Sequence, residues 1–242
     1  MKFIKKIITN QTASLSNADF SEGEIILIDK PSGPTSFQIV SKIRKITGVK
    51  KVGHSGTLDP KASGLMIVCT GKKTKEMDNF IGLNKTYAGV IRLGLTSPSM
   101  DTETECSEIP IPGEIDLDKI LRVRDTFLGE IEQTPPMYSA VKVGGKKLYN
   151  LARKGKSIER EPRRIFIEKF EINKVDLPDI HFAITCSKGT FIRVIADDFG
   201  KRLNTGGVLV ELRRTGIGEF SVDEALSINS FATQFSSQMA GG

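Results

Sequence analysis

The chain has 242 residues, of which 38% are hydrophobic, so it can bury the core of one large domain or two small ones and is not wholly disordered. No apolar run reaches the roughly 18 residues of a membrane-spanning helix, and lysines interrupt the first ten residues where a signal peptide needs an apolar core, so we expect a cytoplasmic protein. The net charge of +6 is concentrated between Lys142 and Lys174, where 11 Lys and Arg accompany 4 Asp and Glu, a distribution typical of proteins that bind a polyanion.

The cysteines and histidines are too few and too scattered for a disulfide framework or a zinc site. Cys69, Cys106 and Cys186 are widely spaced, and no histidine lies near any of them in the sequence. We therefore expect three buried structural thiols and no bound metal.

The first half of the chain alternates short strands with one clear helix. Residues 1–21 are polar and are interpreted as an N-terminal extension. Apolar runs predict strands at 24–30, 64–71 and 85–94. Between the first two strands, Phe37, Val40, Ile43 and Ile46 have helical spacing, and Gly48 is a typical helix stop.

The second half contains a basic stretch between regular elements. Helices are predicted at 116–129 and 221–235, a strand at 164–175, and a strand from 180 that turns into a helix around Ile192. The elements lack the regular alternation of a doubly wound fold, so the sequence predicts an α+β domain with a mixed, mainly antiparallel central sheet flanked by helices and loops.

Nucleotide-binding loops do not fit this sequence. In "GLMIVCTGKKT", six residues separate Gly64 from Gly71 where a phosphate-binding loop has four, and "GIGEF" at 216–220 lacks a third glycine. No Ser, Cys or Lys stands in a recognisable nucleophilic setting, which leaves the carboxylates as reactive groups.

Asp59 is the best placed carboxylate because it lies in the glycine-rich turn "GHSGTLDPKASG" at 53–64. Such a turn lets another backbone approach closely, and the proline after Asp59 favours extended geometry at that residue. Local chemistry alone favours an Asp-Pro turn that merely reverses the chain.

Several segments together resemble a known family. The turn at 53–64, "LIDKPSGPTS", "NKTYAGVIRLG", "PPMYSAVKVGGKKLYNLARKG", "CSKGTFIRVIADDFG" and "ELRRTGIGEF" resemble, in order and spacing, motifs of the bacterial tRNA pseudouridine synthases that modify uridine 55, the TruB family. They cover residues 22 to 220. The resemblance implies a catalytic domain at 22–242 with the pseudouridine-synthase fold, and the tRNA T-arm as partner.

The resemblance also implies roles for individual residues, and it implies no cofactor or metal. Asp59 is the expected catalytic carboxylate, Arg193 its cationic partner, and Tyr87 the ring that stacks on the target uracil. Whether Asp59 attacks the ribose C1′, attacks the uracil C6, or acts as a base at C2′ stays open. His54 is expected to pack against the displaced part of the RNA loop, while Phe191, in place of a commoner tyrosine, and Leu212 line the uracil pocket.

The basic stretch corresponds to a family loop, here about 137–164, that folds over the bound RNA stem-loop. The expected phosphate contacts are Lys142, Lys146, Lys147, Arg153 and Lys154, with Lys30 and Lys75 as further candidates. We also expect a monomer without the small C-terminal RNA-binding domain of many relatives. The alternatives are a catalytically silent RNA-binding or RNA-folding module and a basic ribosome-associated structural protein.

Overall fold

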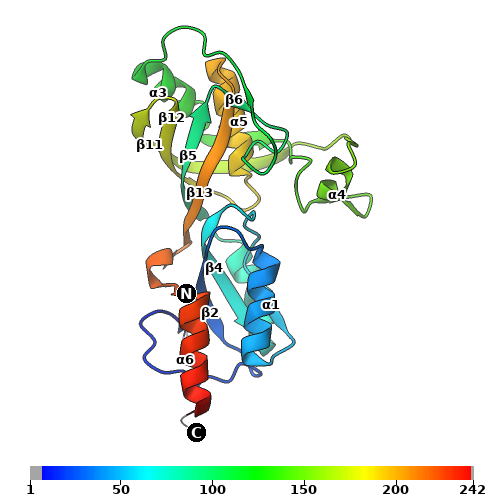
Figure 1. Ribbon diagram of the computed structural model, residues 1–242, viewed down its shortest axis with the longest axis vertical. Helices are drawn as coiled ribbons and strands as arrows, with labels where there is room; N and C mark the ends of the chain where they lie inside the picture. The colour runs from blue at the N-terminus through cyan, green and yellow to red at the C-terminus, as the bar shows by residue number, and fades with distance from the viewer. Residues whose placement is uncertain (1–6, 241–242) are drawn as a thin grey trace. The chain divides into compact units, whose positions relative to one another are not determined.

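The chain forms two units in the computed structural model, which describes residues 7–240 apart from the side chains of residues 147 and 238–240 (Figure 1). Unit 1 comprises Met1–Thr86 and Arg213–Gly242, and unit 2 comprises Tyr87–Leu212. The chain passes between them along two strands, β5 (Lys85–Leu93) and β13 (Gly207–Ile217).

Unit 1 is built on a sheet with the strand order β1-β2-β4-β13. Strands β2 and β4 are antiparallel, and β13 pairs in parallel with β4 through Arg213 beside Ser63 and Arg214 beside Gly64. The elements of this unit are β1 (Ile7–Ile8), β2 (Ile25–Lys30), α1 (Ser36–Thr47), β3 (Val52–His54), β4 (Ser63–Thr70), α2 (Met77–Ile81), β14 (Phe220–Ser221), β15 (Leu226–Ser227) and α6 (Ile228–Ala240), with 3-10 helices at Gly71–Glu76 and Val222–Glu224.

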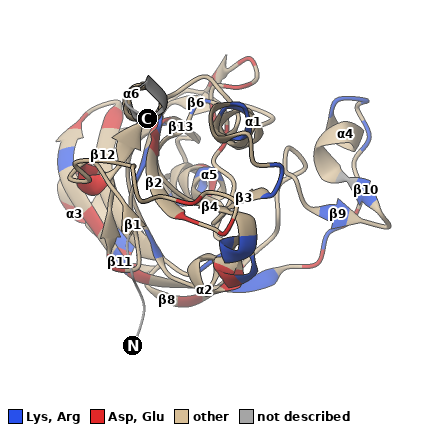
Figure 2. Cartoon of the chain, turned by 90° about the horizontal axis from the view of Figure 1, so that it is seen from below, with Lys and Arg blue, Asp and Glu red and all other residues tan. Residues whose placement is uncertain are grey.

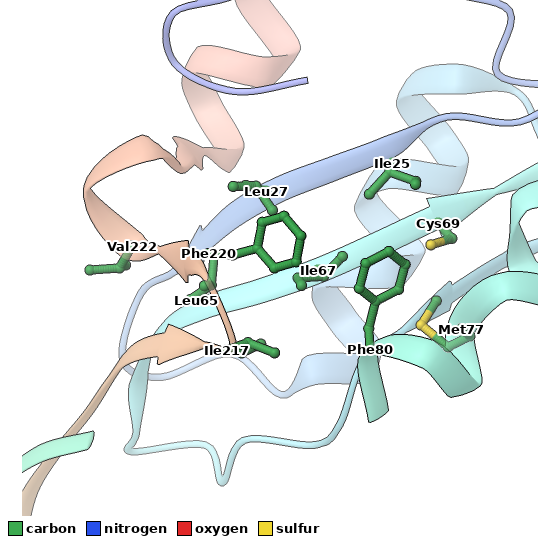
Figure 3. Packing of buried hydrophobic residues seen from close by; sticks show 10 residues of the cluster. All are labelled: Ile25, Leu27, Leu65, Ile67, Cys69, Met77, Phe80, Ile217, Phe220 and Val222. Carbon is green, nitrogen blue, oxygen red and sulfur yellow. The ribbon is translucent and has the colours of Figure 1, made fainter. Parts of the chain in front are cut away.

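The core of unit 1 lies between this sheet, α2 and the strand β14 (Figure 3). Leu27, Leu65 and Ile67 project from β2 and β4 toward the rings of Phe80 and Phe220, which meet edge to face with centroids 5.8 Å apart. Aromatic pairs of this geometry add to the stability gained by burying apolar area. The core thereby supports β4, the strand that follows the Asp59 turn.

Unit 2 continues with the strand order β13-β5-β12-β11-β8. Its further elements are β6 (Leu95–Thr96), β7 (Ser107–Glu108), α3 (Leu117–Asp125), β8 (Gly129–Gln133), β9 (Lys142–Val143), β10 (Lys146–Lys147), α4 (Leu148–Ala152), β11 (Arg163–Asp176), β12 (Asp179–Cys186) and α5 (Ile192–Leu203). Phe127, Phe170, Phe182 and Phe199 form a connected aromatic core beneath α3 and α5. None of the helices within residues 7–240 is both long and apolar enough to cross a membrane.

The predicted α+β class with a mainly antiparallel sheet is confirmed. Helix α1 begins with a capping box between Thr35 and Gln38 and ends at Gly48, whose φ of 71° is the left-handed conformation that glycine adopts readily. The predicted turn of the chain from a strand into a helix at Ile192 is also present.

Four expectations are wrong in detail. Residues 7–21 are no mere extension, because β1 pairs with β2 and both Leu15 and Phe20 are buried. The helix predicted at 221–235 begins only at Ile228, after a 3-10 turn and β15. Phe37, expected on the buried face of α1, is 67% exposed. Cys69 and Cys186 are buried as predicted, whereas Cys106 is partly exposed.

Candidate active site

The turn that carries Asp59 joins β3 to β4 and contains no regular secondary structure. Asp59 is half-buried, and its carbonyl accepts a hydrogen bond from the Ala62 N–H at 3.1 Å. Backbone N–H and C=O groups that leave regular structure need other partners when they are buried. Side chains from three different elements of unit 1 supply these partners.

Lys30, the last residue of β2, lies under the turn. Its ammonium group donates hydrogen bonds to the carbonyls of Pro31 at 3.0 Å, Pro60 at 3.1 Å and Ala62 at 2.5 Å. Burial lowers the pKa of Lys30 to about 8, against the attraction of the Asp59 carboxylate, which raises it. Because Lys30 is 0% exposed, the prediction that it contacts RNA phosphates is wrong, and two of its three hydrogen bonds hold the turn instead.

Ser36, the first residue of α1, holds the residue that precedes Asp59. Its hydroxyl accepts a hydrogen bond from the Leu58 N–H at 2.9 Å and donates one to the Leu58 carbonyl at 3.1 Å. The Gly33 N–H adds a hydrogen bond to the Pro60 carbonyl at 2.8 Å. The segment "PSGPTS" therefore holds the Asp59 turn in place through these hydrogen bonds. The motif alone does not indicate this structural role.

Two adjacent arginines of β13 bind different partners, and only Arg214 reaches the turn. Successive strand residues point to opposite faces. Arg214 is buried, and donates to the Leu65 carbonyl at 2.7 Å and to the Gly56 carbonyl at 3.2 Å, while Arg213 forms a bidentate ion pair with Asp29 at 3.0 and 2.8 Å. The sequence alone indicates no role for either arginine, although both stand in the "LRRTG" motif.

His54 ends β3 and is half-buried beside the same turn. Its Nδ1 accepts a hydrogen bond from the Gly56 N–H at 3.3 Å, and burial lowers the pKa of the imidazole below its usual value. His54 is thus neutral at physiological pH and presents an uncharged ring beside the turn.

The other predicted active-site residues belong to unit 2. Arg193 lies in the first turn of α5, and its guanidinium group donates to the carbonyls of Ser99, at 3.2 Å, and Tyr138. It also sits 5.7 Å from the ring centroid of Phe191, so the structure brings these two predicted residues together. Tyr87, on β5, is buried, and Leu212, on β13, is half-buried.

The predicted RNA-binding loop contains the hairpin β9-β10 and the short helix α4. Figure 2 shows its blue segments around β9, β10 and α4. The side chains of Lys142, Lys146, Arg153 and Lys154 are exposed, as is Lys75 in unit 1, whereas the side chain of Lys147 lies outside the described residues. Three of these lysines, Lys142, Lys146 and Lys154, line a hollow of about 480 Å³.

Tyr149 of α4 contacts Glu103, in the loop between β6 and β7. The Tyr149 hydroxyl donates to the Glu103 carboxylate at 3.0 Å, and this hydrogen bond raises the pKa of the tyrosine. The ring of Tyr149 also packs edge to face against Tyr138, with centroids 6.1 Å apart. Across the described residues, no three His, Cys, Asp or Glu side chains are grouped so as to hold a metal ion.

Comparisons with known proteins agree on one family. Residues 44–192 match the description "TruB family pseudouridylate synthase (N terminal domain)". The tRNA pseudouridine synthase B of Flavobacterium johnsoniae is 45% identical over 88% of this chain and 96% of its own length. The enzyme of the same name from Chlorobium chlorochromatii is 46% identical over 91% of this chain and 88% of its own.

Solved structures give the same result for the fold. A chain in the crystal structure of a Cbf5-Nop10-Gar1 complex is 30% identical, with a TM-score of 0.71 over 90% of this chain. A chain in an H/ACA RNP bound to a substrate RNA containing 2′-deoxyuridine is 27% identical, with a TM-score of 0.66. This chain spans 56% and 53% of those two chains, respectively.

We expect the contribution of Lys30 to stability to depend on pH. Its folded pKa of about 8 lies below the ordinary value of 10.5. Between these two pH values the unfolded chain binds more protons than the folded protein, so raising the pH through this window stabilises the native state. Below about pH 8 Lys30 is charged in both states, and the full free-energy cost of burying its charge is present. Urea unfolding of the native protein and Lys30→Met between pH 8 and 10.5 measures this effect.

The stability difference between native protein and Lys30→Met is expected to grow with pH in favour of the native protein. Lys50→Met, at an exposed lysine of the same unit, is the control and is expected to show no such trend. A difference that shrinks as the pH rises would contradict a buried, cationic Lys30.

Proposed function

This chain belongs to the TruB family of pseudouridylate synthases, and from that premise we propose that it converts uridine 55 in the T-loop of tRNA to pseudouridine. The reaction is an isomerisation. The bond between uracil N1 and ribose C1′ breaks, and a bond from uracil C5 to C1′ forms. C5 loses its proton, and N1 gains one. Atoms balance without an oxidant, reductant or cofactor, so the protein must supply position, charge and proton transfer.

The observation that carries this proposal is the support of the Asp59 turn. Lys30, Ser36 and Arg214, all buried, hold the backbone on either side of this half-buried carboxylate. A preorganised charged group stabilises a transition state without reorganising at the moment of reaction. A turn that only reversed the chain would not need three buried polar side chains, each of which costs desolvation.

We assign the remaining site residues by their resemblance to the family. Arg193 balances the charge of the Asp59 carboxylate, and its planar guanidinium suits a bidentate partner. Tyr87 stacks on the flipped uracil, and Phe191 and Leu212 line the pocket. Extruding a stacked nucleotide costs a few kcal/mol. His54, neutral and half-buried, offsets part of this cost by packing against the opened RNA loop.

The basic loop, about 137–164, provides the RNA-clamping surface of a catalytic domain that we place at 22–242, to whose sheet residues 7–21 add the strand β1. Its exposed Lys and Arg side chains suit phosphate contacts, which fix the register of the RNA without reading its sequence. We further propose that the enzyme acts as a monomer, needs no metal, and works in the cytoplasm, where its tRNA substrate is found.

Replacing Asp59 is the direct test of this function. The native protein is expected to release tritium from tRNA labelled at uridine C5, and Asp59→Ala to lose at least about 10²–10⁴-fold in rate while still binding tRNA. Asp78→Ala, at an exposed carboxylate of α2 in the same unit, is expected to keep the native rate. No release by the native protein would refute the isomerase, and a fully active Asp59→Ala would refute the role of this residue.

RNA affinity is expected to fall steeply with salt because phosphate contacts release counterions. Replacing Lys146 and Lys154 together with Gln removes two such contacts and is expected to flatten the slope of log affinity against log salt by roughly 1.4–1.8. The control replaces Lys169 and Lys174, which are exposed on β11 of the same unit. Equal slopes for the two double variants would contradict the clamping role of the loop.

A further inference from the structure

Gln133 is a buried amide at the root of the basic loop. It is the last residue of β8, lies beside Arg163 of β11 in the sheet, and is 4% exposed. The chain leaves the sheet directly after it and enters the segment that leads to the loop at 137–164. A buried side-chain amide has a donor and an acceptor that both need partners.

Both ends of this amide pair with one residue far along the chain. The Phe191 N–H donates to Gln133 Oε1 at 2.8 Å, and Gln133 Nε2 donates to the Phe191 carbonyl at 3.1 Å. The two hydrogen bonds fix the peptide groups on both sides of the Phe191 Cα, as a neighbouring strand would. Phe191 is the N-cap residue of α5, and its own side chain makes no capping hydrogen bond.

Arg193 lies two residues after Phe191, at the same start of α5. The Arg193 guanidinium lies over the Phe191 ring and donates to the carbonyl of Tyr138. The short segment from Gln133 to Tyr138 therefore meets the start of α5 at both of its ends, through a side chain at one end and a carbonyl at the other. A rotation of the Phe191 backbone would displace the ring and the cation above it together.

From this geometry we infer that Gln133 is a positioning residue, which fixes Phe191 and, through it, the Arg193 guanidinium. The inference rests on the proposed function, since it concerns the same reaction. Gln133 acts through its partners: the hydrogen bonds to Phe191 set where the cation stands, and misplacement by about 1 Å far from the chemistry can cost on the order of 10²-fold in rate.

The test compares Gln133→Met, which keeps the length of the side chain and removes both hydrogen bonds, with Glu132→Met, at the exposed neighbouring position of β8. For Gln133→Met we expect kcat for tritium release to fall roughly 10–100-fold. KM for tRNA should stay unchanged, because the phosphate contacts of the loop remain. Glu132→Met should match the native protein. A native kcat in Gln133→Met would overturn the inference. A loss of activity that is fully explained by a smaller amount of folded protein would overturn it too.

A second variant separates positioning from stability. Gln133→Glu keeps an acceptor for the Phe191 N–H but places a carboxylate oxygen, which cannot donate a hydrogen bond, opposite the Phe191 carbonyl. Burial raises the pKa of such a carboxyl group, and once protonated it again donates to that carbonyl. The kcat of Gln133→Glu relative to the native protein is therefore expected to recover as the pH falls. A ratio that does not change with pH would contradict the role of the donated hydrogen bond.

Hydrogen exchange at the Phe191 amide tests the inference independently of catalysis. Exchange is expected to accelerate in Gln133→Met and to stay at the native rate in Glu132→Met. If the native protein released no tritium, the proposed function would fail while this measurement still tested the positioning. If tritium release were normal and exchange equal in the two variants, the inference alone would fail.

Discussion

The fold of unit 1 depends on satisfying the backbone of one irregular turn. Residues 55–62 leave the sheet between β3 and β4, yet Ser55, Leu58 and Ala62 are buried, so their backbone groups must find hydrogen-bond partners. Lys30 from the end of β2, Ser36 from the start of α1 and Arg214 from β13 supply them. Strand β2 thus ends and helix α1 begins where their side chains reach this turn, and Arg214 reaches it from within β13.

This arrangement places fixed positive charge beneath a carboxylate. Lys30 and Arg214 are both buried close to the turn, and the opposite charges of Lys30 and Asp59 attract each other. Three carbonyl acceptors and that attraction offset part of the cost of burying the ammonium group. In unit 2 the same principle recurs with a different donor, since Arg193 is oriented by two carbonyls and an aromatic ring. Rigid cations and a rigid turn suit a reaction in which charge develops and then disappears.

Local patterns in the sequence predict helices and strands well, but they do not predict which distant residues contact each other. The helical spacing of α1 and the alternation in β11 and β12 identify these elements, because periodicity is a local property. Lys30 was misassigned because a lysine at a strand end is usually exposed, and its acceptors at residues 60 and 62 are contributed by another loop. Gln133 gave no signal, because its partner lies 58 residues away. The glycine-rich turn singles out Asp59 among the carboxylates, but only the resemblance of many segments at once to one family indicates a catalytic role for it.

Buried side chains hold the Asp59 turn rigid, and hydrogen exchange at the Leu58 amide is the most direct test of this rigidity. This amide donates to the Ser36 hydroxyl. In the native protein we expect it to exchange as slowly as amides in the centre of β4, and in Ser36→Ala to exchange roughly 10-fold faster or more, since a lost buried hydrogen bond costs about 1–3 kcal/mol. Native exchange as fast as that of exposed loops, or an unchanged rate in Ser36→Ala, would contradict the account.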